Sequence, residues 1–399
     1  MRVLIWASTL QADILALAQH LDGRPDTELL VAAEGVEAWR REPIARVRPF
    51  RAPLLDRASA DTPAQVRAFG ADVVVCDNHF PEFPAASRVC FLWHGLGWKA
   101  KDPKDIGVNA GHIQRLTGID PRRPNPRLLA QCYHERDRDW RIRSWGYAPE
   151  NCVVTGSCFS DLILSPPYSR ADLAPDYRID VAGRKTLLLN FGWHYGRIFP
   201  GSWQPRLLGS SPMDADLAFV RALFARADVH GASVLFCLHD RWRYEPAYLE
   251  ALHREAGRFP HVELKHKNER PDNLADLVVA DAWVSNLSSF VTFFYHSGRP
   301  SVHLLPQRGA KIRYSRVTRF GLRARPAEPE VEWMSQPEDN GGLSAYDATE
   351  ALAAVDRALT EPDCCRERAQ RWLETHVAGS DGQASRRLGD AIAELAARP

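Results

Sequence analysis

The sequence lacks a Cys-x-x-Cys pair, a long apolar run and an excess of either charge, and each absence excludes a class of protein. Its eight cysteines are scattered without metal-ligand spacing, so we expect no zinc site and no disulfide framework, as in a reducing compartment. No stretch approaches the roughly 20 apolar residues that span a bilayer. The formal net charge of +1 gives no general attraction to nucleic acid. We therefore expect a cytoplasmic protein with no nucleic-acid partner, compatible with peripheral association at the inner face of a membrane.

Several familiar nucleotide-binding and catalytic motifs are also missing. The sequence contains no Gly-x-Gly-x-x-Gly, no Walker-type phosphate loop and no Gly-x-Ser-x-Gly elbow. Two Asp-x-Asp pairs, at 137–139 and 214–216, have the spacing used by metal-dependent transferases. The first lies among arginines and the second at a predicted helix start, where acidic residues are favoured anyway. We therefore predict no metal site and no bound cofactor.

Length and hydrophobic patterning predict an α/β protein of two domains. A chain of 399 residues exceeds what one hydrophobic core usually supports. Short apolar runs alternate with amphipathic segments, which is typical of parallel sheets covered by helices on both faces. The polar, proline-containing stretch 165–183 is predicted to link the two halves.

The expected elements follow from this patterning, and two stretches between them are expected to be irregular. Residues 100–130 are rich in proline, glycine and arginine and predict a long loop over a cleft, and residues 320–345 are polar and irregular. Strands are predicted at Val3–Trp6, Leu29–Ala33, Asp72–Cys76, Val89–Trp93, Cys152–Val154, Thr186–Leu189, Ser233–Leu238, Val262–Leu264, Ala282–Ser285 and Ser301–Leu304. Helices are predicted at Ala12–Leu21, Pro63–Phe69, Arg136–Trp145, Leu217–Ala227, Pro246–Glu255, Tyr346–Leu359, Cys364–His376 and Ser385–Ala397.

Four of the apolar runs end at clusters of polar residues that could bind a ligand or take part in catalysis. In open parallel sheets, ligands bind beyond the carboxyl ends of the strands. Four such ends, spread over both halves of the chain, predict one cleft between two sheets. The clusters begin at His94, Asn190, His239 and Asn286.

The first cluster supplies a candidate base. His94 follows a predicted strand and precedes Gly95, so its imidazole is expected at a loop with little steric cover. An imidazole titrates near neutrality and can accept a proton from an attacking hydroxyl. Lys99 adds a positive charge suited to a phosphate. The alternative is an ordinary histidine in a strand-to-helix turn.

The last cluster resembles an anion site. Asn286, Ser288 and Ser289 precede an aromatic segment that is predicted to be helical, so the serines fall at the start of a helix. Unpaired N–H groups and the helix dipole favour an anion there, and the hydroxyls add donors. The alternative is plain N-capping by serine.

Other strand ends supply further candidates. His239 and Arg241 follow one predicted strand, and His194 and Arg197 follow another, so all four are candidate diphosphate contacts. Their alternative is a surface turn. Thr155, Gly156 and Asp161 follow the strand that ends at 154, near the presumed hinge between the domains.

In their order along the chain, these residues resemble the CDP-glycerol glycerophosphotransferase family of teichoic acid and capsule synthesis. His94-Gly95 with Lys99 is similar to the family's His-Gly-Thr-Pro-x-Lys, and the stretch 281–300 is similar to its Asp-x-x-Ile-Thr-Asp-Tyr-Ser-Ser and downstream Gly-x-Pro. Thr155-Gly156 with Asp161 resembles its Thr-Gly-x-x-x-x-Asp element, and 235–240 resembles its strand that ends in His-Pro. The likeness extends from about residue 85 to 305.

The resemblance implies the GT-B architecture, in which two Rossmann-like domains with parallel sheets face each other across a cleft. It implies an acceptor-side domain over 1–165, a nucleotide-donor domain over 183–345, and C-terminal helices over 346–399 of which the last crosses back to the first domain. The donor diphosphate would contact Ser288, Ser289 and His239 without an essential metal, and His94 would activate a hydroxyl acceptor.

The sequence departs from the family at several motif positions. Asn286 replaces an acidic residue, Asp240 replaces the proline of His-Pro, Leu96-Gly97 replaces Thr-Pro, and a second aspartate is lost near Thr292-Phe293. The donor is therefore CDP-glycerol or a nucleotide sugar, and the unit transferred is glycerol-phosphate or a sugar. Two other hypotheses stay open: a nucleotide-sugar 2-epimerase of the same shape, and a nucleotide-binding module without catalysis.

Overall fold

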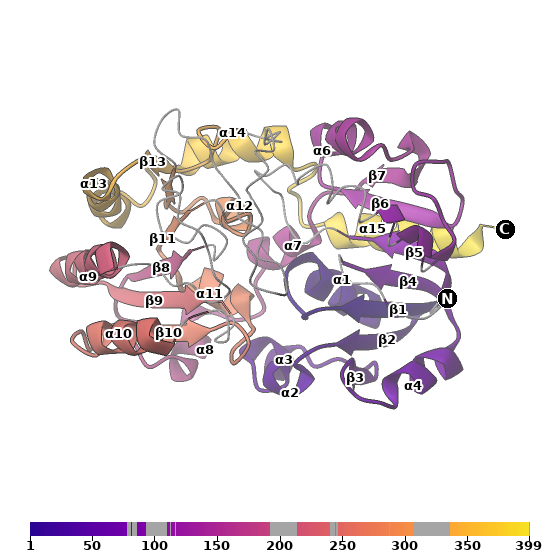
Figure 1. Cartoon of the computed structure of the whole chain (residues 1–399), viewed down its shortest axis with the longest axis horizontal. Coiled ribbons are helices and arrows are strands. Elements are labelled where there is room, and N and C mark those ends of the chain that lie inside the picture. The colour runs from indigo at the N-terminus through magenta and orange to yellow at the C-terminus, as the bar shows by residue number, and fades with distance from the viewer. Residues whose placement is uncertain are drawn as a thin grey trace, which may run out of the picture.

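The protein consists of two parallel β-sheets, each flanked by helices, in two lobes that lie side by side (Figure 1). The computed structural model describes residues 1–77, 81, 86–92, 110–111, 113–115, 117–191, 214–239, 244, 246–286, 288–305 and 336–398. Within these residues the first sheet has seven strands and the second has six, and all neighbouring strands run parallel. The predicted fold class is confirmed.

The N-terminal sheet has the strand order β3-β2-β1-β4-β5-β6-β7. Its interior strand β1 is a continuous apolar run because both faces are covered, and Val3, Leu4 and Ile5 are each 0% exposed. The strands are β1 (Arg2–Ala7), β2 (Glu28–Ala33), β3 (Leu54–Asp56), β4 (Ala71–Cys76), β5 (Ala86–Phe91), β6 (Leu128–Cys132) and β7 (Cys152–Val154).

The C-terminal sheet has the order β10-β9-β8-β11-β12-β13. Along β8, Leu187 and Leu189 belong to one hydrophobic cluster and Leu188 to another, as expected where successive side chains point to opposite covered faces. The strands are β8 (Thr186–Asn190), β9 (Ser233–Leu238), β10 (Val262–His266), β11 (Ala282–Ser285), β12 (Ser301–Leu304) and β13 (Leu343–Ala345).

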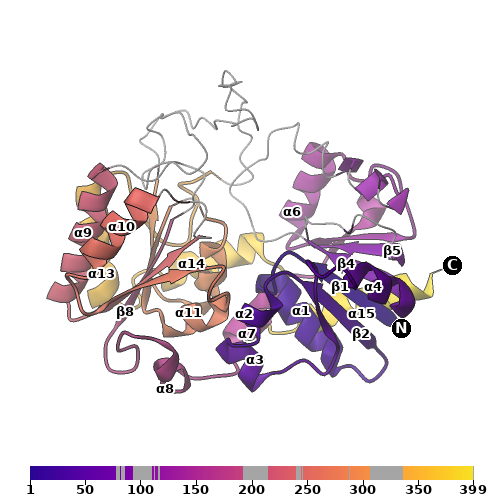
Figure 2. The same cartoon turned by 60° about the horizontal axis from the view of Figure 1, so that its bottom comes forward.

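Helices connect the strands and cover the sheets. Figure 2 shows the segment that carries α8 passing between the two lobes. The first lobe and this segment contain α1 (Ala12–Gly23), α2 (Val36–Trp39), α3 (Pro43–Val47), α4 (Thr62–Phe69), α6 (Glu135–Trp140), η1 (Arg141–Trp145), η2 (Pro149–Asn151), α7 (Cys158–Leu164), α8 (Arg170–Leu173) and η3 (Ala174–Asp176). The second lobe contains α9 (Asp214–Val229), α10 (Pro246–Ala256), α11 (Asn273–Val279), α12 (Val291–Phe294), η6 (Tyr295–Ser297) and α13 (Ala348–Thr360).

The chain finally returns to the first lobe through α14 (Arg366–His376) and α15 (Ala384–Ala397). In Figure 1 the yellow helix α15 lies within the indigo and purple lobe, and it contacts α1, α7 and strands β4, β5 and β6. Its apolar face is buried at Leu388, Ile392 and Leu395, each 0% exposed. The last helix therefore completes the core of the domain that begins the chain.

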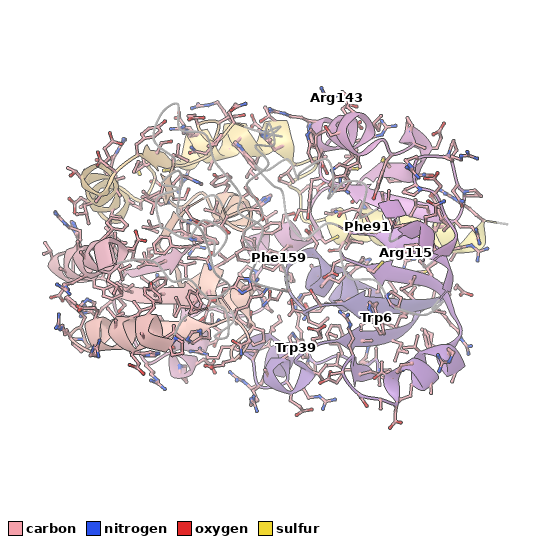
Figure 3. All side chains as sticks on the ribbon, in the orientation of Figure 1. Trp6, Trp39, Phe91, Arg115, Arg143 and Phe159 are labelled. Atoms are coloured by element: carbon pink, nitrogen blue, oxygen red, sulfur yellow. The ribbon has the colours of Figure 1, made fainter. Side chains whose placement is uncertain are left out.

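An aromatic contact joins the two lobes near their centre. Phe159 of α7 packs edge-to-face on Phe293 of α12, with ring centroids 5.2 Å apart, and Phe290 lies 5.9 Å from Phe159. Phe159 is labelled between the lobes in Figure 3. Such pairs are worth about 0.5–1.5 kcal/mol beyond their buried area, so this contact helps to fix the lobes relative to each other.

The predictions of two irregular stretches are wrong at the C-terminal end of each stretch. The loop predicted over 100–130 contains the start of β6, whose five residues are all buried. The stretch 320–345 contains β13. The helix predicted at Arg136–Trp145 is divided into α6 and the π-helical turn η1.

In the described part of the chain, no helix has both the length and the apolar character needed to cross a membrane.

Candidate functional site

The carboxyl ends of three neighbouring strands meet at one edge of the C-terminal sheet. Asn190, the last residue of β8, pairs in register with Ser285 of β11 on one side and with Cys237 of β9 on the other. The Ser285 hydroxyl donates to the Asn190 carbonyl at 2.8 Å, and Asn190 Nδ2 donates to the Cys237 carbonyl at 3.2 Å. The chain therefore leaves β8, β9 and β11 at neighbouring points of one sheet edge.

The turn after β11 carries three of the predicted site residues. Asn286 is 1% exposed, whereas Ser288 and Ser289 are half-buried. Ser288 Oγ accepts a hydrogen bond from the Phe290 amide at 3.3 Å, and the Ser289 carbonyl accepts one from the Thr292 hydroxyl at 2.7 Å. The serines thus stabilise the turn, and both residues remain partly exposed.

The aromatic segment after this turn is helical and stops at Gly298, as predicted, but it is short. The element α12 has four residues, and only the three-residue turn η6 continues it. A helix dipole is the sum of many aligned peptide units, so a single turn produces little of it. The helix dipole therefore adds only a weak attraction for an anion at this turn. A phosphate at Ser288 and Ser289 would depend on hydroxyl and amide donors.

His239 begins at the same edge of the sheet, directly after β9. Its backbone N–H donates to the Tyr244 hydroxyl at 2.9 Å, and its carbonyl lies 3.2 Å from Nδ1 of His266. The His239 residue is half-buried. These contacts fix its backbone next to the end of β8, so its imidazole starts close to the other strand-end residues.

Six predicted site residues lie outside the described residues. The described residues end at Leu92 before the first cluster, and they end at Phe191 and His239 inside the second and third clusters. The roles predicted for these residues therefore stay predictions. They are His94, Gly95, Lys99, His194, Arg197 and Arg241.

A polar cluster at the carboxyl edge of the N-terminal sheet escaped the sequence analysis. Asp77, directly after β4, is 6% exposed and accepts a hydrogen bond from the Ser8 hydroxyl at 2.9 Å. Arg57 donates to the Ala7 carbonyl at 2.8 Å and lies 4.8 Å from the centre of the Trp6 ring. Ser8 and Asp77 both follow buried apolar strands, so the rule that singled out the other strand ends would have found them.

The carboxyl ends of the two sheets meet where the segment after β10 touches the first lobe. Gln11, which follows β1, donates through Nε2 to the Pro271 carbonyl at 2.7 Å. One carboxylate oxygen of Asp272 accepts the Ile44 amide of α3 at 3.0 Å, and the other accepts the Ala275 amide of α11 at 3.0 Å. Asp272 thus caps helices of both lobes at once, which ties the two sheet edges together.

The contact is reciprocal and buried. Glu42, at the N-cap of α3, accepts the backbone N–H of Asp272 at 3.0 Å. The two carboxyl groups are 5% and 2% exposed, and burial raises the pKa of each above its ordinary value. Lys265 donates to the Asp272 carbonyl and to the Asp276 carboxylate, both at 2.7 Å, and supplies the compensating charge.

Comparisons with known proteins identify the architecture. No family model and no curated protein matches the sequence. A solved structure of the wall teichoic acid polymerase TagF, a histidine variant, matches with a TM-score of 0.65 and 13% identity over 99% of this chain and 89% of that chain. The UDP-N-acetylglucosamine 2-epimerase of Neisseria meningitidis, bound to UDP-GlcNAc, matches with a TM-score of 0.57 and 12% identity over 99% and 100%. The chain has the GT-B fold.

Another TagF variant, soaked with CDPG, matches this GT-B chain equally well, with a TM-score of 0.65, 12% identity and the same coverage of 99% and 89%. At 12–13% identity these likenesses establish the fold alone. A polymerase and an epimerase therefore share the GT-B architecture of this chain, and its activity has to be argued from its own residues.

Thr155, Gly156 and Asp161 lie where the GT-B chain returns to its first lobe. The Asp161 carboxylate accepts the Ser385 amide at 2.7 Å at the start of α15, and Arg387 of that helix donates to the Thr155 carbonyl at 2.9 Å. Gly156 has φ +82°, and a Cβ there would lie 2.3 Å from the Ala378 carbonyl oxygen. These contacts hold the returning helix, and the predicted hinge role of the three residues stays a prediction.

Asp13 forms a second buried polar centre behind the sheet edge. Its carboxylate accepts hydrogen bonds from the Tyr133 hydroxyl at 2.5 Å, the Ser157 hydroxyl at 2.8 Å and the Phe159 amide at 2.9 Å. The residue is 1% exposed, and burial raises the pKa of the carboxyl despite these bonds. It joins α1 to the segments after β6 and β7.

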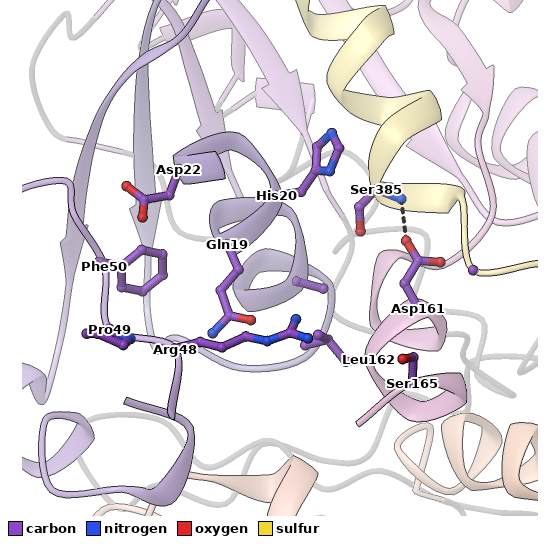
Figure 4. Close-up of a pocket in the computed structure, with 12 residues that line it drawn as sticks. Gln19, His20, Asp22, Arg48, Pro49, Phe50, Asp161, Leu162, Ser165 and Ser385 are labelled. Atoms are coloured by element: carbon purple, nitrogen blue, oxygen red, sulfur yellow. Dashed lines mark hydrogen bonds between the residues drawn. The ribbon is translucent and has the colours of Figure 1, made fainter. Parts of the chain in front are cut away.

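A pocket of about 280 Å³ lies between α1, α7 and the start of α15 (Figure 4). Its wall mixes Asp22 and Asp161 with His20 and Arg48, and Asp161 is already engaged by α15. None of Asn190, His239, Asn286, Ser288 and Ser289 lines it, so it is not the candidate donor site. Among the described residues, no group of three or more His, Cys, Asp or Glu side chains is placed to hold a metal ion.

Proposed function

We propose that the protein is a GT-B transferase that moves a glycerol-phosphate or sugar unit from a nucleotide-activated donor to a hydroxyl acceptor. The reaction would serve the synthesis of a cell-surface polymer or glycan. One observation carries the proposal. The chain leaves β8, β9 and β11 at neighbouring points of the sheet edge where α/β folds bind ligands. The likeness to TagF supports the same interpretation.

In the proposed reaction, the donor diphosphate contacts Ser288, Ser289 and His239, with His194, Arg197, Arg241 and Asn286 as further candidates. The acceptor oxygen attacks the phosphorus of glycerol-phosphate, or the anomeric carbon of a sugar. The bond from that atom to the nucleotide phosphate oxygen breaks, and the nucleotide leaves with the electron pair. His94 takes the acceptor proton, and Lys99 offsets the charge on the departing phosphate.

A thermal-shift screen tests donor binding. CDP-glycerol and UDP-, GDP- and CMP-linked sugars are compared, and we expect one to raise the melting temperature, because a ligand at about 100 times its Kd stabilises the native state by about 2.7 kcal/mol. Replacing both Ser288 and Ser289 by Ala should reduce the shift. Ser297→Ala is the matched control, because that hydroxyl donates to the Phe294 carbonyl at the other end of the same aromatic segment. If no donor shifts the melting temperature, the donor site is refuted.

The role of His94 is tested by His94→Ala. Loss of a general base typically lowers turnover by about 10²- to 10⁴-fold, so we expect a fall in that range with an unchanged melting temperature. Product is measured by mass spectrometry with the donor identified above. His253→Ala is the control, because His253 is an exposed residue of α10. Near wild-type turnover in the His94 variant would remove this residue from the mechanism.

An epimerase is the second candidate, favoured by the likeness to the UDP-GlcNAc 2-epimerase over that protein's whole length. Incubation with a nucleotide sugar and no acceptor separates the two activities. An epimerised nucleotide sugar would support the epimerase, whereas a product formed only with a hydroxyl acceptor would support the transferase.

A nucleotide-binding module without catalysis is the third candidate. It is motivated by Asn286, a neutral residue where the resembled family has an acidic one, and Asn286 is buried. This candidate predicts a thermal shift with a nucleotide and no product with any acceptor. Turnover with any donor and acceptor pair would exclude it.

A further inference from the structure

A basic surface segment of the first lobe belongs to none of the sites described above. Residues 40–51, which contain α3 and the residues on either side of it, include five arginines and a single acid, Glu42. Glu42 is 5% exposed and accepts the Asp272 amide, so its carboxyl lies beneath the surface. The five arginines are all exposed, and they are Arg40, Arg41, Arg46, Arg48 and Arg51.

The acids around this segment compensate only part of its charge. Arg41 and Arg48 have no ion-pair partner among the described residues. The other three arginines each meet one acid, and the side chains of Arg40 and Arg46 are still 53% and 52% exposed. These pairs are Arg40 with Glu37 at 2.6 Å, Arg46 with Asp176 at 2.6 Å and Arg51 with Asp22 at 3.7 Å, while Glu34 lies 3.6 Å from Arg57. The surface is therefore cationic.

An apolar side chain lies in the middle of this cationic surface. The helix α3 buries Pro43–Ala45, and its exposed side carries Val47 between Arg46 and Arg48. Val47 is 49% exposed and is one of three large hydrophobic residues with high exposure among those described. Arginines around an exposed aliphatic side chain suit an anionic lipid surface, where the guanidinium groups meet headgroups and the apolar group enters the boundary of the acyl region.

The aromatic side chains of the segment are poorly placed for nucleic acid, the other common partner of arginine clusters. Single strands bind by stacking their bases on open aromatic faces. Trp39 is 3% exposed, and its ring packs on that of Phe50 with centroids 5.2 Å apart. Phe50 is itself half-buried. The surface thus presents an aliphatic side chain, and its aromatic rings pack on each other.

We propose that this basic patch, made of Arg40, Arg41, Arg46, Val47, Arg48 and Arg51, docks the protein on an anionic membrane surface. In Figure 1, α2 and α3 lie at the lower edge of the first lobe, close to the second. Asp272 of the second lobe accepts the Ile44 amide of α3, so docking through the patch also orients the second lobe on the membrane. The assignment does not depend on the proposed transfer reaction.

Flotation with lipid vesicles tests this surface. We expect the wild type to bind vesicles made of phosphatidylcholine and phosphatidylglycerol in equal amounts, and to leave vesicles of phosphatidylcholine alone unbound. Raising the salt to about 1 M shortens the Debye length to about 3 Å, so it should release the protein.

The double variant Arg41→Ala/Arg48→Ala removes the two arginines without partners, so it should fold normally. We expect about 30-fold weaker binding to the anionic vesicles, from the usual contribution of two arginines close to such a surface. Arg143→Ala/Arg254→Ala is the matched control, because these exposed arginines of η1 and α10 also lack an ion-pair partner among the described residues. The control should bind like the wild type.

Val47→Asp adds a negative charge at the centre of the patch and should weaken binding by about tenfold or more. Val229→Asp is its control, because Val229 is 78% exposed at the end of α9 in the second lobe. Both variants should keep the melting temperature of the wild type.

The proposal is overturned if the wild type binds neither kind of vesicle, if it binds both equally, or if the patch variants bind like their controls. A single-stranded oligonucleotide that releases the wild type from anionic vesicles, and that the arginine double variant does not bind, would also overturn it, because the patch would then serve nucleic acid. None of these outcomes bears on the candidate donor site.

Discussion

Gly156 stands at a position where the backbone geometry and the neighbouring chain both require glycine. Its φ of +82° is unfavourable for other residues, and an added Cβ would lie 2.3 Å from the Ala378 carbonyl oxygen. We expect Gly156→Ala to lower the free energy of unfolding by more than the roughly 1–2 kcal/mol of a left-handed alanine, because the returning chain must also shift. Gly35→Ala is the control, since Gly35 has φ +68° but an added Cβ there would meet no heavy atom within 4 Å. If urea unfolding gives the same loss of unfolding free energy for Gly156→Ala and Gly35→Ala, this account is contradicted.

The buried carboxyl of Asp13 should make part of the stability depend on pH. Burial raises its pKa in the folded protein above the unfolded value of about 3.9, so the folded state binds the proton more tightly. The resulting stabilisation is present at low pH and is lost as pH rises through the folded pKa.

The matching variant is Asp13→Asn, which cannot titrate. We expect the difference in unfolding free energy between wild type and variant to fall as pH rises from about 4 to about 8, because only the wild type loses the proton. Urea unfolding of both proteins across this range measures it. A difference that grows with pH would mean that hydrogen bonds from Tyr133, Ser157 and Phe159 outweigh burial.

At the scale of elements, the carboxylate of Asp272 caps both α3 and α11. Asp272→Ala removes a cap from each helix, and each cap is worth about 0.5–2 kcal/mol, so we expect a loss of about 1–4 kcal/mol. Asp347→Ala is the control, because Asp347 caps α13 alone by accepting the Glu350 amide at 2.9 Å. Small-angle scattering should show a change in the relative position of the lobes for Asp272→Ala only. If the two variants give identical scattering, Asp272 does not fix the position of one lobe relative to the other.

The elements that the sequence predicted well are those with long apolar runs buried on both faces, such as β1 and β9. The strands β3, β6 and β13 were missed. The strand β6 follows Pro121, Pro124 and Pro126, and this irregular composition hid a buried strand that starts at Leu128. The strand β13 has three residues within a polar stretch, so no apolar run marks it. Local composition dominates such predictions, whereas burial depends on neighbours that are distant in sequence.

The same distinction applies to the candidate site. Strand ends follow from local patterns, so Asn190, His239 and Asn286 were predictable as neighbours of one sheet edge. The cap of Ile44 by Asp272 was not, because the two residues are 228 positions apart and each alone resembles an ordinary helix start. Single sequences carry no signal for such pairs.

For the whole molecule, the two lobes should unfold together. One hydrophobic cluster contains Val3 and Ile5 of the first sheet, Leu188 and Leu235 of the second, and Phe293 between the lobes. Unfolding of one lobe would expose the shared core of the other, so we expect a single transition in scanning calorimetry, with equal calorimetric and van't Hoff enthalpies. Two resolved transitions would mean that the lobes are energetically independent.

The path of α15 also has a consequence for biosynthesis. The helix packs against β4, β5 and β6 of the first lobe, yet the ribosome adds its residues only after those of the second lobe. At about 5–20 residues per second, the nascent first lobe waits for many seconds with an open apolar surface. A stalled or prematurely terminated product would keep that surface exposed, and we expect chaperones to be engaged until the final helix emerges.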